Sequence, residues 1–221
     1  AQARLTGFDD PILDVGCGSR PARLAAFRKV GFRRLLGVEP FLDRDVVYQG
    51  IAVRRRRLAD VTGQFGLIMF HHSFEHVPDP DATMARAAAL LRPGGSLLIR
   101  TPVMGSGLWE RYGVDWIELD PPRHLFVLPA AAIRRRAERN GLVAGPVVPD
   151  SSAWELVGSE QYRRDVAMLE PGSWFVDPAG SGWSDEEIAR LADEARRLNA
   201  EGGAGRAGFW FHRPVDAPSP R

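Results

Sequence analysis

Short apolar runs alternate with amphipathic stretches in the first half of the chain. Runs bounded by turn residues lie at 11–15, 34–38, 54–58, 66–71 and 96–100, and each predicts a buried strand. Between them we expect helices, one beginning near residues 19–21 and ending at Gly31, and one spanning 79–91 before Pro93 and Gly94. This alternation predicts a Rossmann-like α/β fold, in which helices cover both faces of a doubly wound, mostly parallel sheet.

The pattern is looser beyond residue 101. A loop rich in Gly, Trp and Pro spans 102–128, followed by a predicted helix over 129–140 and a strand over 142–148. Within the stretch 149–205, Ser184 and Glu187 fit a capping box that opens a helix, and residues 202–205 look like a flexible linker. The apolar run at 208–212 predicts a closing antiparallel strand. We therefore expect residues 1–221 to form a single domain.

Composition and charge narrow the class of partner. The chain has 29 basic and 28 acidic residues, a formal charge of +1, which gives no field that would select nucleic acid. No apolar run is long enough for a membrane span, and the single cysteine, Cys17, cannot form an internal disulfide. These observations predict a cytoplasmic protein with a small-molecule partner, and they leave the oligomeric state open.

A glycine-rich turn, Asp14-Val15-Gly16-Cys17-Gly18, connects the first predicted strand to the first helix. Its glycines let the backbone approach a ligand that also faces the helix N-terminus. The dinucleotide fingerprint would place a third glycine at position 21, where this chain has Pro21. Glu39 follows the second strand, where an acid accepts hydrogen bonds from ribose hydroxyls. The pattern favours a nucleoside without a pyrophosphate, and a nucleotide-dependent oxidoreductase is the alternative.

Five motifs follow one another in a familiar order: residues 12–18 (ILDVGCG), 37–40 (GVEP), 59–61 (ADV), 74–80 (FEHVPDP) and 90–95 (LLRPGG). In this order they resemble class I S-adenosylmethionine (SAM)-dependent methyltransferases, particularly those of the ubiquinone-biosynthesis type. Residues 113–116 (GVDW), 121–125 (PPRHL) and 140–142 (NGL) also resemble a subgroup of this family. The resemblance covers roughly residues 10–148. It implies SAM as cofactor, S-adenosylhomocysteine (SAH) as its product, and methyl transfer to a small-molecule acceptor, with O-methylation favoured.

The resemblance also assigns residues to the methionine end of SAM. It implies that Asp14 holds either the glycine loop or the amino-acid end of the cofactor. Gly16 and Gly18 then line the methionine portion with Cys17 between them, although packing as a small apolar residue is an alternative for the thiol. The family has a third glycine where this chain has Arg20. This arginine either displaces the turn or reaches toward the SAM carboxylate, which leaves open a binding module of the same fold without catalysis.

The nucleoside end and the sulfonium take the remaining cofactor residues that the resemblance implies. Glu39 binds the ribose, with Pro40 next to it in the motif. Asp60 faces the adenine amino group, and Val61 donates a backbone contact. His71, just past the fourth predicted strand, is expected near the sulfonium.

The acceptor site is predicted from chemistry and from topology. A hydroxyl acceptor needs a base with a pKa near neutrality, which suits a histidine. His124 and His76 are the candidates, with Glu75 able to orient one of them; for Glu75 and His76, capping of backbone groups is the alternative. No metal is expected. The stretches 102–128 and 149–205 follow core strands and are expected to form a lid with Trp116 in the acceptor pocket, unless their aromatic rings pack on the core.

Overall fold

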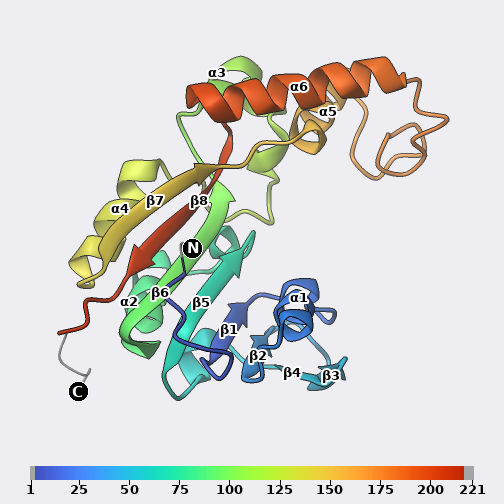
Figure 1. The fold of residues 1–221 in the computed structure, drawn as a ribbon. Coiled ribbons are helices and arrows are strands. Elements are labelled where there is room, and N and C mark those ends of the chain that lie inside the picture. Colours follow the sequence, from blue (N-terminus) through green and yellow to red (C-terminus); the bar gives the residue numbers. More distant parts are fainter. Residues whose placement is uncertain (1–2, 217–221) are drawn as a thin grey trace. The chain divides into compact units, whose positions relative to one another are not determined.

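The computed structural model describes residues 3–216 (Figure 1). They form two compact units. Unit 1 consists of the chain up to Thr101, Ala130–Val147 and the chain from Gly208 on, and unit 2 consists of Pro102–Pro129 and Val148–Ala207. Unit 2 therefore consists of almost the same two stretches that are predicted to form a lid. The single domain and the lid stay predictions.

An eight-stranded sheet carries the core of unit 1, in the order β3-β4-β2-β1-β5-β6-β8-β7. Strand β1 (Ile12–Val15) pairs in parallel with β2 (Leu35–Val38) and β5 (Phe65–His71), β2 pairs in parallel with β4 (Ile51–Arg54), and β5 with β6 (Leu91–Pro102). Figure 1 shows β8 (Arg206–His212) running opposite to its neighbours β6 and β7 (Val143–Pro149). The predicted mostly parallel sheet with an antiparallel C-terminal strand is confirmed.

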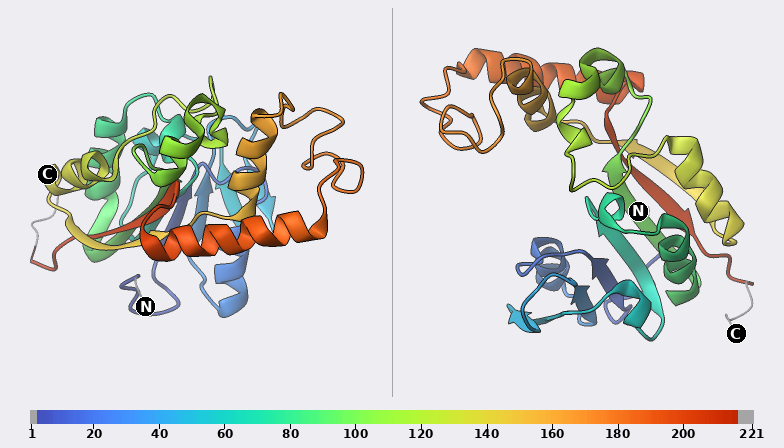
Figure 2. Two further views of the ribbon diagram at one scale, coloured as in Figure 1. Left: turned by 90° about the horizontal axis from the view of Figure 1, so that it is seen from above. Right: turned by 180° about the vertical axis from the view of Figure 1, so that it is seen from behind.

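Helices cover both faces of this sheet, as predicted. Helix α1 (Ala22–Val30) lies on one face, and α2 (Pro80–Leu90) and α4 (Ala130–Arg139) lie on the other (Figure 2, left). Helix α1 begins at Ala22, directly after the predicted range of 19–21, and Pro21 is its N-cap residue. Asp79 caps α2 by accepting the backbone N–H groups of Asp81 and Ala82 at 3.0 and 2.9 Å.

The third predicted strand was placed too late in the sequence. The structure has β4 at Ile51–Arg54, and Leu58–Asp60 forms a 3₁₀ turn, η1, instead of a strand end. Ile51 and Val53 are the buried positions of β4, whereas the arginines that follow it are exposed. A further strand, β3 (Val46–Tyr48), forms an antiparallel hairpin with β4 through Gln49 and Gly50, which both have positive φ.

Unit 2 has more regular structure than its sequence suggested. The predicted loop over 102–128 contains α3 (Gly107–Tyr112) and the 3₁₀ turns η3 (Gly113–Asp115) and η4 (Ile117–Leu119), and α5 (Ala153–Tyr162) was not predicted at all. Helix α6 (Asp185–Glu201) begins with the predicted capping box, in which the Glu187 N–H donates to the Ser184 hydroxyl oxygen at 3.2 Å.

Residues of unit 2 form a hydrophobic core of their own. Trp116 lies in this core, 0% exposed, and its Nε1 donates to Oε1 of Glu155 at 2.9 Å. Its expected place in an acceptor pocket is therefore wrong, and the core-packing alternative holds for this ring. The linker predicted at 202–205 is also wrong. Gly202 caps α6 with φ 84°, and the Gly205 N–H donates to the Ser151 hydroxyl oxygen at 2.8 Å.

Candidate functional site

The carboxyl ends of four parallel strands bring together the loops that hold most of the predicted cofactor residues. In the register of the sheet, Val15 at the end of β1 pairs with Val38 of β2, which in turn pairs with Arg54 of β4. His71 at the end of β5 pairs with Arg100 of β6. Ligands of open α/β sheets bind at this edge. The loops after β1, β2, β4 and β5, all in unit 1, are therefore the candidate site.

The turn after β1 is closely packed and requires glycine. Gly16 has φ +72°, and a Cβ atom on it would lie 2.4 Å from the Cβ of Ser73. Its N–H donates to the Val38 carbonyl at 2.8 Å, and the Ser73 hydroxyl donates to the Val15 carbonyl at 2.6 Å. Around Gly18, in contrast, no atom lies within 4 Å of an added Cβ. The turn is thus held against the β5 loop on one side and open on the other.

Glu39 connects the loops that follow β1 and β2. Its Oε2 accepts the Gly18 N–H at 3.2 Å, and its Oε1 accepts the Phe41 N–H at 3.1 Å. The side chain is half-buried. Two carboxylate oxygens offer about four acceptor positions, so these two bonds leave capacity for further donors. Ribose binding by Glu39 stays a prediction, and Pro40 continues the same loop.

Cys17 packs as a small apolar side chain. A Cβ atom on Gly37 would lie 2.5 Å from the Cys17 sulfur, so the thiol occupies the space that a glycine in β2 leaves free. Burial, with the nearby carboxylates of Asp14 and Glu39, raises the pKa of the thiol to about 12. The sulfur is therefore protonated and unreactive, in agreement with the packing alternative.

Asp14 is a buried carboxylate that lacks a hydrogen-bond partner. Its side chain is 1% exposed, and within the described residues neither of its oxygens accepts a hydrogen bond. Burial raises its pKa to about 7, although the charge of Arg23 acts in the opposite direction. One of the two roles expected for Asp14, holding the glycine loop, is wrong, because Glu39 and Ser73 make those bonds. The other, binding the amino-acid end of SAM, stays a prediction.

His71 is half-buried at the end of β5, and its Nδ1 has no hydrogen-bond partner in the described part of the chain. Burial, followed by the charges of Arg23 and Arg100, lowers its pKa to about 3. The ring is therefore neutral at physiological pH and offers no positive charge to repel a cationic ligand. Its predicted place near a sulfonium is compatible with this state and stays a prediction.

The other predicted cofactor residues lie on the surface or in tight turns. Asp60 is exposed, as is Arg20, the residue that replaces the third glycine of the family. The Val61 N–H already donates to the Leu58 carbonyl at 3.1 Å and closes the turn η1. A backbone contact from Val61 to a ligand would have to share that hydrogen with the Leu58 carbonyl, at a cost in free energy. This role of Val61 stays a prediction.

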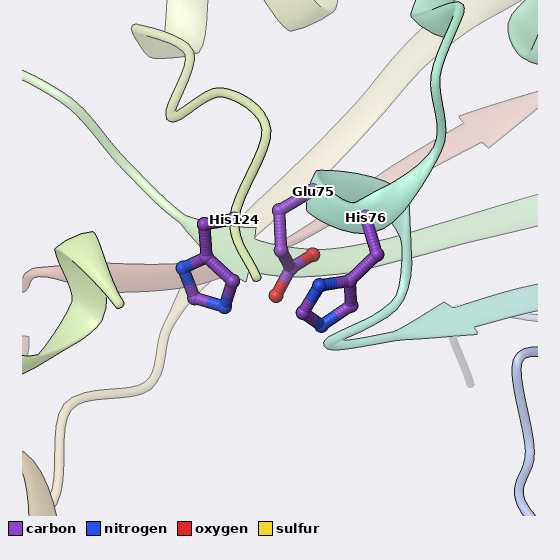
Figure 3. A group of neighbouring side chains, drawn as sticks. All are labelled: Glu75, His76 and His124. Atoms are coloured by element: carbon purple, nitrogen blue, oxygen red, sulfur yellow. The ribbon is translucent and has the colours of Figure 1, made fainter. Parts of the chain in front are cut away.

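Glu75 and His76 lie side by side on η2 (Phe74–His76), the turn that follows β5 (Figure 3). Glu75 is 0% exposed, and its Oε2 accepts the Thr101 hydroxyl at 2.9 Å. Its Oε1 lies 3.4 Å from Nδ1 of His72, whose φ of 50° places it in the left-handed region. Glu75 therefore contacts the imidazole of His72, a contact that sequence spacing did not indicate.

His124 belongs to unit 2, where a contact between its ring and the backbone carbonyl of Glu118 fixes one tautomer. Its Nδ1 lies 2.7 Å from the Glu118 carbonyl oxygen, and because a carbonyl only accepts, Nδ1 carries the proton. In the neutral ring the lone pair is then on Nε2, which lies 3.8 Å from Oδ2 of Asp120. The catalytic roles of His124, His76 and Glu75 stay predictions.

Comparison with known proteins gives one family and several relatives. The family described as "Methyltransferase domain" matches residues 7–144, more than half of the chain. A ubiquinone biosynthesis O-methyltransferase of Xanthomonas oryzae is 35% identical over 112 residues, covering 45% of this chain and 46% of the relative. The Escherichia coli protein of the same name is 27% identical over 123 residues, covering 50% and 47%. The chain thus matches about half the length of these relatives.

Solved structures share the fold at low sequence identity. Geranyl diphosphate C-methyltransferase from Streptomyces coelicolor, solved with SAH, has a TM-score of 0.57 and 16% identity, and the match covers 96% of this chain and 76% of that one. Its acceptor differs from that of the O-methyltransferases, so the shared fold carries no information on the acceptor. Among the described residues, no helix combines the length and the apolar character needed to cross a membrane.

Proposed function

The chain belongs to the methyltransferase domain family, and on that premise we propose that it transfers the methyl group of SAM to a hydroxyl oxygen of a small molecule. The observation that best supports SAM binding is Asp14, a buried carboxylate that lies beside a glycine turn and has no hydrogen-bond partner. Such a group is costly unless a cation pairs with it in the complex. The α-ammonium of SAM is a cation of the right size.

The residues around Asp14 fit the rest of the cofactor. The space beside Gly18 admits a ligand close to the backbone, and Glu39 has acceptor capacity for ribose hydroxyls. The carboxylates of Asp14 and Glu39 at this edge suit a zwitterion and a nucleoside better than a pyrophosphate. When bound, SAM supplies an electrophilic methyl group, and the protein contributes by aligning the acceptor with it, an effect of up to roughly 7–11 kcal/mol.

SAH is expected to raise the melting temperature of the protein, and NAD is expected to leave it unchanged, because only a ligand of the native state stabilises it. Glu39→Ala should weaken SAH binding by about 1.5–3 kcal/mol, the usual contribution of a hydrogen bond to a charged group. Calorimetric titration measures this directly. Because Glu39 also holds two loops, Glu39→Gln is the second variant, and it should retain part of the affinity. Wild-type protein that binds NAD and ignores SAH would favour an oxidoreductase and contradict the proposal.

The hydroxyl acceptor is supported by the relatives named O-methyltransferases and by the tautomer of His124. With the proton on Nδ1, the Nε2 lone pair can accept the proton of a phenol or alcohol. His76, with Glu75 next to it, is the second candidate base. Both assignments belong to the proposal.

His124→Asn should lower turnover about a hundredfold while SAH affinity stays unchanged, the pattern of a residue that acts on the acceptor. The assay uses radiolabelled SAM with a panel of catechols and simple phenols. His76→Asn in the same assay identifies the base, because only the variant that lacks the base loses turnover. If both variants turn over normally, the base assignment is wrong. If the wild-type protein binds SAH but methylates none of the panel, the hydroxyl acceptor is contradicted, as for a binding module without catalysis.

A further inference from the structure

One face of the sheet in unit 1 carries ionisable side chains at its carboxyl end. Residues in register on neighbouring parallel strands point to the same face, and Asp14 is in register with Gly37. A Cβ atom on Gly37 would lie 2.5 Å from the Cys17 sulfur and 3.5 Å from Cδ1 of Leu24, a residue of α1. Asp14 therefore points to the face that α1 covers.

His71 and Arg100 lie on the same face. Asp14 is in register with Met69, His71 follows Met69 by two residues, and His71 is in register with Arg100. The hydrophobic cluster on this face contains Met69, Leu98 and Leu24. The ionisable groups thus begin where the apolar part of this face ends.

Arg23 lies in the first turn of α1, the helix that covers this face. It immediately precedes Leu24, is half-buried, and makes no hydrogen bond or ion pair with any of residues 3–216. Its charge lowers the pKa of both Asp14 and His71. Other arginines of unit 1 are engaged, for example Arg28, which donates to the Gly50 carbonyl at 2.6 Å.

An acid at the end of β1 and a base in the first turn of α1, which do not pair with each other, leave room for a ligand that carries both charges. The carboxylate of Asp14 and the guanidinium of Arg23 do not bond to each other, although burial favours pairing of opposite charges. A zwitterionic amino acid satisfies both, with its ammonium on the acid and its carboxylate on the guanidinium. The backbone N–H groups at the start of α1, where Pro21 provides no side-chain cap, add to the attraction for an anion.

We propose that Arg23 binds the α-carboxylate of the cofactor's methionine portion, opposite Asp14, and that Arg20 has no part in it. This inference rests on the proposed function. Arg20 is the arginine that replaces the family's glycine, but its side chain is exposed on the turn. Guanidinium binds a carboxylate through two parallel hydrogen bonds, which a lysine cannot reproduce in full. Arg23 thereby distinguishes SAM from adenosine derivatives that lack the carboxylate.

The test compares SAM with decarboxylated SAM and with 5′-methylthioadenosine, by calorimetric titration of the whole chain. Wild-type protein should prefer SAM over decarboxylated SAM by about ten- to a hundredfold, the range of a charged hydrogen-bonded pair. In Arg23→Gln this preference should disappear, because SAM binds more weakly while the two other ligands bind as before. Arg23→Lys should recover part of the preference. Arg20→Gln, the matched control three residues away, should behave like the wild type.

Each alternative result has a distinct meaning. If Arg23→Gln keeps the wild-type preference while Arg20→Gln loses it, the carboxylate is held by Arg20 and the inference is overturned. Equal weakening of all three ligands in Arg23→Gln would also overturn it, because the residue would then support the fold of the site rather than the carboxylate. If the wild-type protein binds neither SAM nor 5′-methylthioadenosine, the proposed function itself fails, and the inference fails with it.

Discussion

Replacement of Arg206 by methionine is expected to lower the free energy of unfolding of unit 2 by about 3–5 kcal/mol, the cost of removing one partner from a buried ion pair. The Arg206 side chain is 8% exposed, with Nη1 3.3 Å from Oε1 of Glu118 and Nε 3.5 Å from Oε2 of Glu155. Its Nη2 donates to the Asp150 carbonyl at 3.0 Å and to the Ser152 hydroxyl at 2.8 Å. Methionine fills similar space but leaves two buried carboxylates without this cation.

The loss in Arg206→Met should be larger at about pH 8 than at about pH 5. Burial raises the pKa of Glu155 above 4.5 in the folded state, so the folded chain binds this proton more readily than the unfolded chain. Ionisation of Glu155 therefore opposes folding as the pH rises, and more so without Arg206. Urea unfolding, monitored by tryptophan fluorescence, measures this loss of stability, because five of the six tryptophans are in unit 2.

Two control variants make this prediction specific. Combining Arg206→Met with Glu118→Gln and Glu155→Gln should recover most of the stability, since the buried charges are then gone. Arg197→Met, on an arginine whose side chain is 64% exposed, should change the stability by less than about 0.5 kcal/mol. A loss that is equal at both pH values and is not recovered by the glutamines would show that Arg206 acts through packing alone.

The parts of the fold that the sequence predicted are those where local residue types determine the structure. The glycine turn after β1 needs positive φ at Gly16, and Asp79 caps α2 with its own side chain, so both follow from neighbouring residues. The third strand was misplaced because only Ile51 and Val53 are buried in it, and two apolar positions give a weak periodicity.

The long aromatic segments could not be interpreted from local pattern. Trp116 is enclosed by residues of α5 and α6, and its hydrogen-bond acceptor, Glu155, is 39 residues away along the chain. Local sequence does not distinguish a tryptophan in a core from one that lines a pocket, because each needs an apolar surrounding and one acceptor for the indole N–H. Only the tertiary structure separates the two, so the sequence left both open.

The candidate site was predicted as a set of loops but not as a set of interactions. Motif positions placed Asp14 and Glu39 at the carboxyl edge, since strand ends of a parallel sheet share that edge. They could not show that Glu39 bonds to both loops or that Asp14 bonds to neither. The rotation of α1 about its own axis decides which of its residues face the sheet. In the sequence, only the neighbouring apolar residue Leu24 indicated the orientation of Arg23.

Asp14→Asn is expected to raise the free energy of unfolding by up to about 4 kcal/mol at pH 8, and to change it little near pH 4. Burial raises the pKa of Asp14 from 3.8 to about 7, so its ionisation opposes folding. The folded and unfolded chains both carry the charge above about pH 7, where the full penalty applies, and neither carries it below about pH 4. Asparagine removes the charge at every pH, and its neutral amide resembles the neutral carboxyl group in size and polarity.

The same substitution should weaken SAM binding strongly, because the ammonium of the cofactor loses its buried counterion. Wild-type affinity for SAM should fall about tenfold per pH unit below about pH 7, as Asp14 takes up its proton, whereas the Asp14→Asn variant should show no such slope. Chemical unfolding and calorimetric titration at several pH values measure both effects, with Asp9→Asn on an exposed residue outside the site as the control. A variant that gains stability at high pH and loses affinity would show that Asp14 opposes folding and is retained for its ligand, as expected where binding and stability compete. Loss of stability at pH 8 would instead mean that the carboxylate has a structural partner and would remove the main support for the cofactor site.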